Sequence, residues 1–206
     1  MATTEHVTAP LDRRGLGLYR LKPWYARRLS GVLSALDRHH VHPDVVSATG
    51  VVVAVGGGVV LAVLPAGILA AGLVFVAAAA RLAAANLDGS LARRRAPRPI
   101  GWLVNEAGDR LADLALLAGL AVHVGGPLGA VLLLASCAPS FVSICTAAAG
   151  GRRHNGGPVG KTERAALCVV AALTGWFAPV AVVVAAGSAL TAGLRVRAAT
   201  QDLVTR

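Results

Sequence analysis

The feature that most constrains this chain is a succession of apolar segments, each about long enough to cross a lipid bilayer. A membrane-spanning helix needs about 20 consecutive, mostly apolar residues, and 55% of the 206 residues are hydrophobic. The apolar residues are mainly alanine, valine and leucine, and the chain has 24 glycines. Small side chains of this kind let helices pack closely in lipid. The composition therefore indicates an integral membrane protein rather than an ordinary soluble one.

Prolines, glycines and charges divide the apolar sequence into six expected membrane spans. We predict an all-α fold, an integral membrane bundle of six transmembrane helices over residues 45–194. We expect residues 1–206 to form a single domain, because the sequence shows no internal repeat and no segment whose composition indicates a second domain. The second span is longer than a bilayer requires, so its carboxyl end is expected to project into the cytoplasm. The predicted spans are 45–64, 67–94, 101–124, 128–149, 162–177 and 179–194.

The placement of the charges predicts how the bundle is oriented. Lysines and arginines lie before the first span, around 81–98, around 152–164 and at the carboxyl terminus, whereas the turns near Pro65, 125–127 and Pro179 carry none. Alternating basic and uncharged loops are typical of an even number of spans with the basic loops in the cytoplasm. We therefore expect a multi-pass protein of the cell membrane with both termini in the cytoplasm. The net charge of +10 is explained by topology, so no nucleic-acid partner is expected.

The segment before the first span differs from the spans in composition. Residues 15–40 alternate apolar and basic residues, and Leu21, Trp24 and Leu29 fall on one face of a helix. This pattern predicts an interfacial amphipathic helix on the cytoplasmic membrane surface. The polar residues before it show no signal-peptide pattern.

Ionisable residues collect in the second and third expected spans. Charges are costly at membrane depth, so they indicate a functional site. Asn105, Asp109 and Asp113 are spaced by four and form one helical stripe, and Asp88 lies on the preceding span. Carboxylate and amide oxygens facing one another suit Mg²⁺ or Mn²⁺ completed by water and substrate phosphate. We predict these four residues as metal ligands at the cytoplasmic end of the bundle; the open alternative is that the carboxylates only pair with nearby arginines.

The same segment resembles the signature of the CDP-alcohol phosphatidyltransferase family. That pattern is Asp, two residues, Asp-Gly, two residues, Ala-Arg, about eight residues, then Gly, Asp and Asp spaced by four. The segments HPDVVSATG before the first span and GKTERAAL before the fifth are also similar to bacterial members. The resemblance extends over most of the chain, and the matching residues of the signature are Asp88, Gly89, Ala92, Arg93, Gly101 and Asp109.

This resemblance implies an activity and roles for single residues. It implies a phosphotransferase of phospholipid biosynthesis, in which an alcohol hydroxyl attacks the β-phosphorus of a CDP-linked lipid, CMP leaves and a phosphodiester lipid forms. Asp88 would bind the metal, and Asp109 would be the base for the acceptor hydroxyl. Membrane lipid and the CDP-linked substrate are the implied partners, and a homodimer is compatible with the resemblance because family members often dimerise. The residues implied to line the CDP site are Gly89, Ala92, Arg93 and Gly101.

Two of the four carboxylates of the family pattern are replaced in this chain. Ala85 stands at the first position and Asn105 at the third. The signature can also be aligned so that Asp109 and Asp113 form its last pair. That alignment would put Asn105 at a glycine position and lengthen the loop, so we prefer the alignment that ends the signature at Asp109. We expect fewer metal ions than the usual two, with one ion recruited by the diphosphate of the substrate. The segment after Pro139 lacks basic residues, which disfavours sugar-phosphate acceptors.

The sequence leaves three functions open. The first is the phosphotransferase described above. The second keeps the fold and the diphosphate pocket but ionises a prenyl diphosphate, as a lyase, cyclase or prenyltransferase. The third is a non-catalytic pseudoenzyme or lipid-binding scaffold. Buried ionisable residues in a membrane pocket favour a catalytic function.

Overall fold

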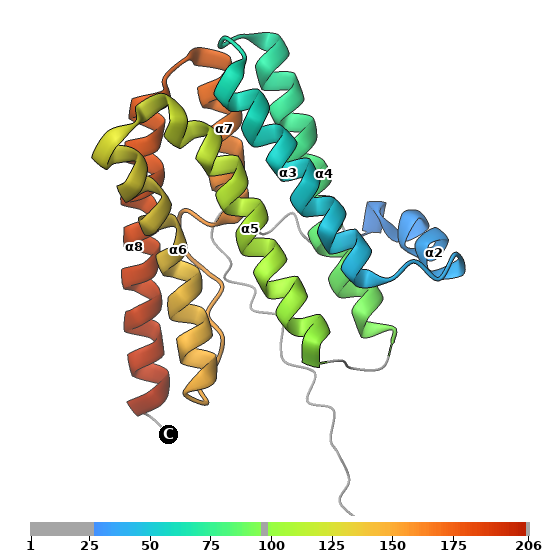
Figure 1. Cartoon of the computed structure of the whole chain (residues 1–206). Coiled ribbons are helices and arrows are strands. Elements are labelled where there is room, and N and C mark those ends of the chain that lie inside the picture. Colours follow the sequence, from blue (N-terminus) through green and yellow to red (C-terminus); the bar gives the residue numbers. More distant parts are fainter. Residues whose placement is uncertain (1–26, 96–98, 205–206) are drawn as a thin grey trace, which may run out of the picture.

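The computed structural model describes residues 27–95 and 99–204, and every regular element in these ranges is an α-helix (Figure 1). The short first helix lies beside the bundle, and the six others form the bundle itself. The all-α prediction is therefore confirmed for the described residues. The helices are α2 (Ser30–Arg38), α3 (Pro43–Val63), α4 (Ile68–Arg93), α5 (Pro99–Val124), α6 (Gly126–Ala148), α7 (Lys161–Thr174) and α8 (Phe177–Val204).

Four of these helices, α3, α4, α6 and α8, are long and apolar enough to cross a membrane. This supports the prediction of a multi-pass membrane protein. Helix α5 is as long as α4, with 26 residues each, but it carries a cluster of charged side chains, and α7 has only 14 residues. The prediction of six spans thus stays a prediction for α5 and α7.

The last helix is longer than the sequence indicated. The predicted span covers 179–194, and α8 continues beyond it to Val204. Arg195 interrupts the apolar pattern without interrupting the helix, since its side chain is buried against the loop before α7. A charge at the end of an apolar run therefore did not mark the end of the helix.

Helix α3 lies between α4 and α5 and packs on both (Figure 1). Glycines bring the backbones together: a Cβ added at Gly58 would lie 2.1 Å from the carbonyl oxygen of Ala115, and one added at Gly119 would lie 2.2 Å from that of Gly58. Close approach through small residues is typical of helix pairs in membranes. On the other side of the bundle α6 packs on α8, and α7 packs on α4.

The amino-terminal helix α2 rests on the end of α4. Leu33 and Leu36 pack near Leu91, and the carboxylate of Asp37 pairs with Arg94 at 2.8 Å. None of the residues of α2 is buried, as expected for a helix with one face toward a membrane surface. The remainder of the helix predicted for 15–40, up to residue 26, lies outside the described residues.

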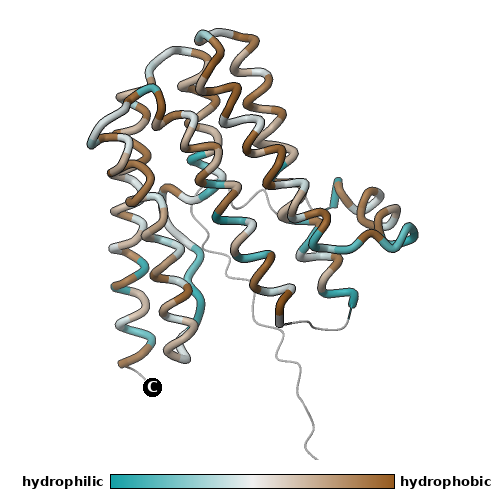
Figure 2. The backbone as a smooth tube through the Cα atoms, in the orientation of Figure 1, coloured by the Kyte–Doolittle hydropathy of each residue, from teal (hydrophilic) through white to brown (hydrophobic). Residues whose placement is uncertain are grey.

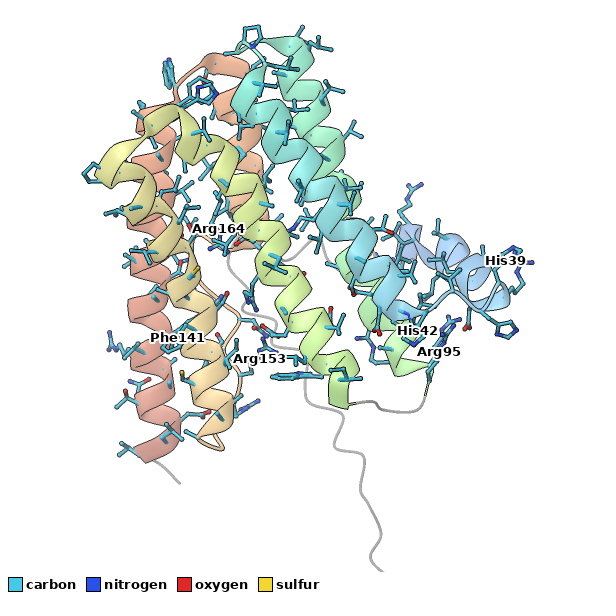
Figure 3. All side chains as sticks on the ribbon, in the orientation of Figure 1. His39, His42, Arg95, Phe141, Arg153 and Arg164 are labelled. Atoms are coloured by element: carbon cyan, nitrogen blue, oxygen red, sulfur yellow. The ribbon has the colours of Figure 1, made fainter. Side chains whose placement is uncertain are left out.

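Hydrophobic residues predominate along the bundle helices, and hydrophilic residues gather around α2, at the end of α4 and along the loop that follows α6 (Figure 2). Phe141 of α6 points away from the bundle and is 68% exposed (Figure 3), and Ile68 of α4 is 81% exposed. Large apolar side chains with such high exposed fractions are expected on a surface that contacts lipid instead of water.

The connection between α6 and α7, residues 149–160, runs back into the bundle alongside α8 (Figure 1). Arg195 of α8 donates from Nε and Nη2 to two successive carbonyls of this segment, each at 2.9 Å. Further along, Thr191 Oγ1 accepts from the backbone N–H of Val159 at 3.1 Å. Non-helical backbone inside a membrane bundle must have its polar groups satisfied by protein, and these two side chains do so. The inserted connection also explains why α7 is short.

This arrangement predicts that Arg195 is needed to hold the inserted connection. In Arg195→Met the two carbonyls lose their donors. The hydrogen bonds that Nη1 of Arg195 donates to Pro139 O and to Ser143 Oγ are lost as well. We expect a loss of at least about 2 kcal/mol in unfolding free energy, together with faster hydrogen exchange of residues 154–160.

Arg197→Met is the matched control, because Arg197 lies two residues further along α8 and is exposed. Its unfolding free energy should change by no more than about 0.5 kcal/mol. Equal stability of the two variants in detergent would contradict the role given to Arg195.

Candidate functional site

A small cavity lies where α3, α4 and α5 meet, and it contains most of the buried charge of these helices. Its polar lining consists of Ser47 from α3, Arg81 and Asp88 from α4, and Asp109 from α5. The space exists because the other lining residues are small. These residues are Gly50, Ala84, Ala85, Gly108 and Ala112.

Asp88 is held in place by two hydrogen bonds. It is 4% exposed. Its Oδ2 accepts from the Ser47 hydroxyl at 2.6 Å, and its Oδ1 accepts from the backbone N–H of Gly89. The carboxylate also lies close enough to Asp109 and Lys161 to interact with both electrostatically. Both oxygens of Asp88 thus have a donor within the protein.

Asp109 is paired with a lysine from the other side of the bundle. Its Oδ2 lies 2.7 Å from Lys161 Nζ, and its backbone carbonyl accepts from Arg81 Nη2 at 3.2 Å. Lys161 is the first residue of α7, whose start is fixed by a bond from the Gly160 N–H to the Glu163 carboxylate at 3.1 Å. A cation is disfavoured at a helix amino terminus, and the carboxylate of Asp109 offsets that cost.

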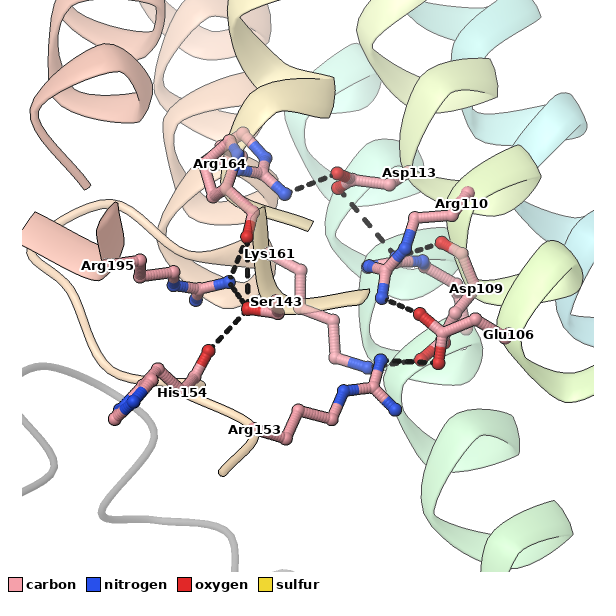
Figure 4. A network of polar contacts seen from close by, with 12 residues as sticks. Glu106, Asp109, Arg110, Asp113, Ser143, Arg153, His154, Lys161, Arg164 and Arg195 are labelled. Atoms are coloured by element: carbon pink, nitrogen blue, oxygen red, sulfur yellow. Dashed lines mark hydrogen bonds and ion pairs between the residues drawn. The ribbon is translucent and has the colours of Figure 1, made fainter. Parts of the chain in front are cut away.

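Asp113 lies one turn deeper and is also neutralised by cations (Figure 4). It pairs with Arg164 of α7, and its Oδ1 lies 3.7 Å from Arg81 Nη2. Arg81 and Arg164 are only 1% and 2% exposed. In each of these guanidinium groups Nε and Nη1 are buried and have no hydrogen-bond partner among the described residues.

A second cluster surrounds Glu106, one turn before Arg110 on α5. Its carboxylate accepts from Arg110 and from Arg153, which reaches it from the inserted connection (Figures 3 and 4). This pairing fixes the connection to α5 from one side, as Arg195 fixes it to α8 from the other. The two clusters together bring side chains of α3, α4, α5, α7 and the α6–α7 connection to one polar centre.

The predicted metal ligands do not form one group. The described residues contain no cluster of three or more His, Cys, Asp or Glu that could hold a metal ion, so the carboxylates of Asp88, Asp109 and Asp113 do not converge on a common point. Asn105 is half-buried on α5, one turn before Asp109. With Ala85 in the cavity wall where the family signature has an Asp, the residues present do not fit the metal set of that family.

The residues predicted to line a CDP site lie beyond the cavity, at the last turn of α4 and the first turn of α5. Gly89 is half-buried, Ala92 and Arg93 are exposed, and Gly101 is half-buried. Arg93 Nη2 donates to Ser90 Oγ at 3.0 Å, so its charge stays near this end of α4. The roles of these residues stay predictions.

The neighbouring arginines of the same segment serve other contacts. Arg94 pairs with Asp37 of α2, and Arg95 donates to the carbonyl of Val41 at 2.9 Å. They hold α2 against α4, whereas Arg98 lies outside the described residues.

Several polar residues of the site were not predicted from the sequence, among them Ser47, Lys161 and Arg164. Ser47 had no signal, because a single serine in an apolar span is a common packing residue. Lys161 and Arg164 did have one: they are three residues apart at the start of the fifth span and so share a helical face. We interpreted them as topology charges, whereas the structure turns that face toward α4 and α5.

The fold and this polar centre define an all-α multi-pass membrane protein with an ionic site inside its helix bundle. Similar folds occur in phosphatidylinositol phosphate synthase (PgsA1) of Mycobacterium tuberculosis. The structure of that protein in complex with manganese and citrate aligns with a TM-score of 0.63 and 21% identity, covering 83% of this chain and 88% of that one. Its structure with CDP-DAG bound aligns with a TM-score of 0.57 and 24% identity, covering 87% and 93%. At these identities the similarity concerns the fold.

Comparisons of the sequence with protein families and with curated proteins found no relative. No protein-family model matches the chain, and no curated protein matches it.

Proposed function

We propose that this chain is a membrane-embedded phosphotransferase that moves a phosphatidyl or similar phospho-group from a CDP-linked donor to an alcohol and releases CMP. The observation that carries the proposal is the cavity in which Asp88, Asp109 and Arg81 face one another inside an otherwise apolar bundle. Buried ionisable residues at membrane depth are costly and are kept for function. The fold similarity to a synthase with CDP-DAG bound supports the choice of donor.

The proposed chemistry follows from the groups around the cavity. The hydroxyl oxygen of the acceptor forms a bond to the β-phosphorus, and the bond from that phosphorus to the bridging oxygen breaks, so that its electron pair leaves with CMP. Asp109 takes the hydroxyl proton on Oδ1, since its Oδ2 is paired with Lys161. Negative charge that grows on the phosphoryl oxygens is stabilised by Arg81 and Lys161.

The proposal also covers the membrane arrangement. We place α5 and α7 within the bilayer, because α5 packs on α3 and α7 packs on α4, both of which are long enough to cross it. The end of the bundle that carries the α4–α5 and α6–α7 connections would then face the cytoplasm, as the basic loops predict. The expected magnesium ion has no step in this proposal, because the residues present do not fit the family's metal set.

The test is a transfer assay with purified protein in detergent. We expect release of CMP from CDP-diacylglycerol when a panel of alcohols is offered, and loss of that release in Asp88→Ala. Sugar phosphates should be poor acceptors, since residues 140–151 contain no lysine or arginine. Pyrophosphate release from a prenyl diphosphate, with no CMP from any donor, would replace this function with a lyase, cyclase or prenyltransferase.

A calorimetric experiment separates a catalytic from a non-catalytic role. CDP, CMP and a prenyl diphosphate analogue are titrated into the wild type and into Asp88→Ala. Binding of CDP that is lost in the variant supports the proposed function. Absence of binding by all three would favour a lipid-binding scaffold.

A further inference from the structure

The charges of the polar centre follow a simple count. We define the ionic network as the charged residues of the cavity lining, the ion-paired residues next to them on α5, the α6–α7 connection and α7, and Arg195 of α8, which is buried and interacts electrostatically with three of these cations. It contains six cations and four carboxylates, so it carries two net positive charges before any ligand binds. The residues are Arg81, Asp88, Glu106, Asp109, Arg110, Asp113, Arg153, Lys161, Arg164 and Arg195.

We propose that this chain binds its diphosphate ligand through fixed cations of the ionic network rather than through divalent metal ions, and that Lys161 takes the position of a metal ion beside Asp88 and Asp109. The identity of the ligand rests on the proposed function. The absence of a metal requirement is a separate property of the site and can be measured without turnover.

The cavity lining offers a cation two carboxylates, and both already have partners within the protein. Asp88 uses both of its oxygens to accept from Ser47 and from the Gly89 N–H, and Asp109 Oδ2 is paired with Lys161 at 2.7 Å. The residues that would complete a metal set are Ala85, which has no ligand atom, and Asn105, which has no charge. A hard divalent cation beside these two residues would gain only two carboxylates from the protein and would lie next to the ammonium group of Lys161.

The charge count also opposes a metal ion. A divalent cation would raise the net charge of the ionic network to four positive charges inside an apolar bundle, where uncompensated charge is costly. A diphosphate diester carries two negative charges and would neutralise the network as it stands. Lys161 already provides a cation for both carboxylates, since it pairs with Asp109 and interacts with Asp88.

Arg81 supplies a donor that is ready for an anion. It lines the cavity and is 1% exposed, and its Nε and Nη1 are buried without a partner among the described residues. Buried donors without partners cost stability unless a ligand or water satisfies them. A guanidinium presents N–H groups in the planar geometry that suits phosphate oxygens. The structure thus offers a phosphate group one point charge, Lys161, and one planar donor, Arg81.

The first experiment measures Mn²⁺ binding directly, by the loss of the free-ion signal in electron paramagnetic resonance. We expect no saturable binding to the wild type in detergent. Ala85→Asp combined with Asn105→Asp restores the two missing carboxylates and should raise the affinity for Mn²⁺ about tenfold or more. The matched control, Asn86→Asp with Ala107→Asp, adds the same charges to the same helices outside the cavity lining and should bind no better than the wild type.

A saturable Mn²⁺ site in the wild type that disappears in Asp88→Ala would overturn the inference. The wild-type titration decides this even where the double variant fails to fold.

The second experiment measures the binding of CDP in the presence of EDTA. We expect the affinity to be the same with and without Mg²⁺, and to fall about tenfold or more in Lys161→Met, since a charge-assisted contact is lost. CDP binding that requires Mg²⁺ would overturn the inference and leave the proposed function standing. Failure of CDP to bind under either condition would instead count against the proposed function, while the Mn²⁺ titration still decides whether the site is a metal site.

Discussion

Asp109→Asn should reduce transfer activity by about 100-fold to 10,000-fold, the contribution of a positioned general base. The asparagine has the same size and can still accept from Lys161, but it cannot take the proton of the acceptor hydroxyl. Transfer is measured as CMP released from CDP-diacylglycerol with the preferred alcohol. Because the substitution keeps the shape of the cavity, we expect the variant to fold and to bind CDP, with a lower thermal unfolding midpoint because Lys161 loses its ion pair.

The matched control is Asp202→Asn, which makes the same chemical change outside the cavity. Asp202 lies near the end of α8 and accepts from the backbone N–H of Arg152 at 3.0 Å. It should retain wild-type CMP release. Undiminished turnover in Asp109→Asn would remove Asp109 from its role as base, whereas equal losses in both variants would point to a general effect of lost carboxylates.

The site and the bundle differ in how far they could be predicted from the sequence. The six bundle helices begin and end close to the predicted limits, because apolar run length and prolines act locally. The exception is α8, which continues ten residues beyond the predicted span and places Arg195 inside the helix. The true partner of Arg195, the connection before α7, is distant in the sequence, and no local pattern reveals it.

Within the site, the sequence predicted the carboxylates but not their partners. The spacing of Asp109 and Asp113 places both on one face of α5, and the pairing of the two neighbouring spans predicted that Asp88 faces them. What faces them depends on how α7 packs, and Lys161 and Arg164 come from that helix about 50 residues later. The prediction of a metal centre considered the acids without these two bases, and it stays a prediction.

Gly119→Ala should destabilise the protein more than any other small substitution discussed, by more than about 3 kcal/mol, since even ordinary overpacking costs about 1 to 3 kcal/mol. The added Cβ would lie 2.2 Å from the carbonyl oxygen of Gly58, a backbone atom that cannot rotate away. Relief requires α3 and α5 to separate, and these helices carry Ser47 and Asp109, which line the same cavity. Loss of stability should therefore be accompanied by loss of CDP binding.

Two glycines that make no close contact provide the controls. A Cβ added at Gly56 of α3 or Gly72 of α4 would meet no atom within 4 Å. Alanine at these positions should be neutral or stabilising by up to about 1 kcal/mol, because it lowers the entropy cost of the helix. The three variants are compared by thermal unfolding in the same detergent. A Gly119→Ala variant as stable as Gly72→Ala would mean that α3 and α5 do not approach so closely in the membrane, and the cavity between them would have to be wider than the one described.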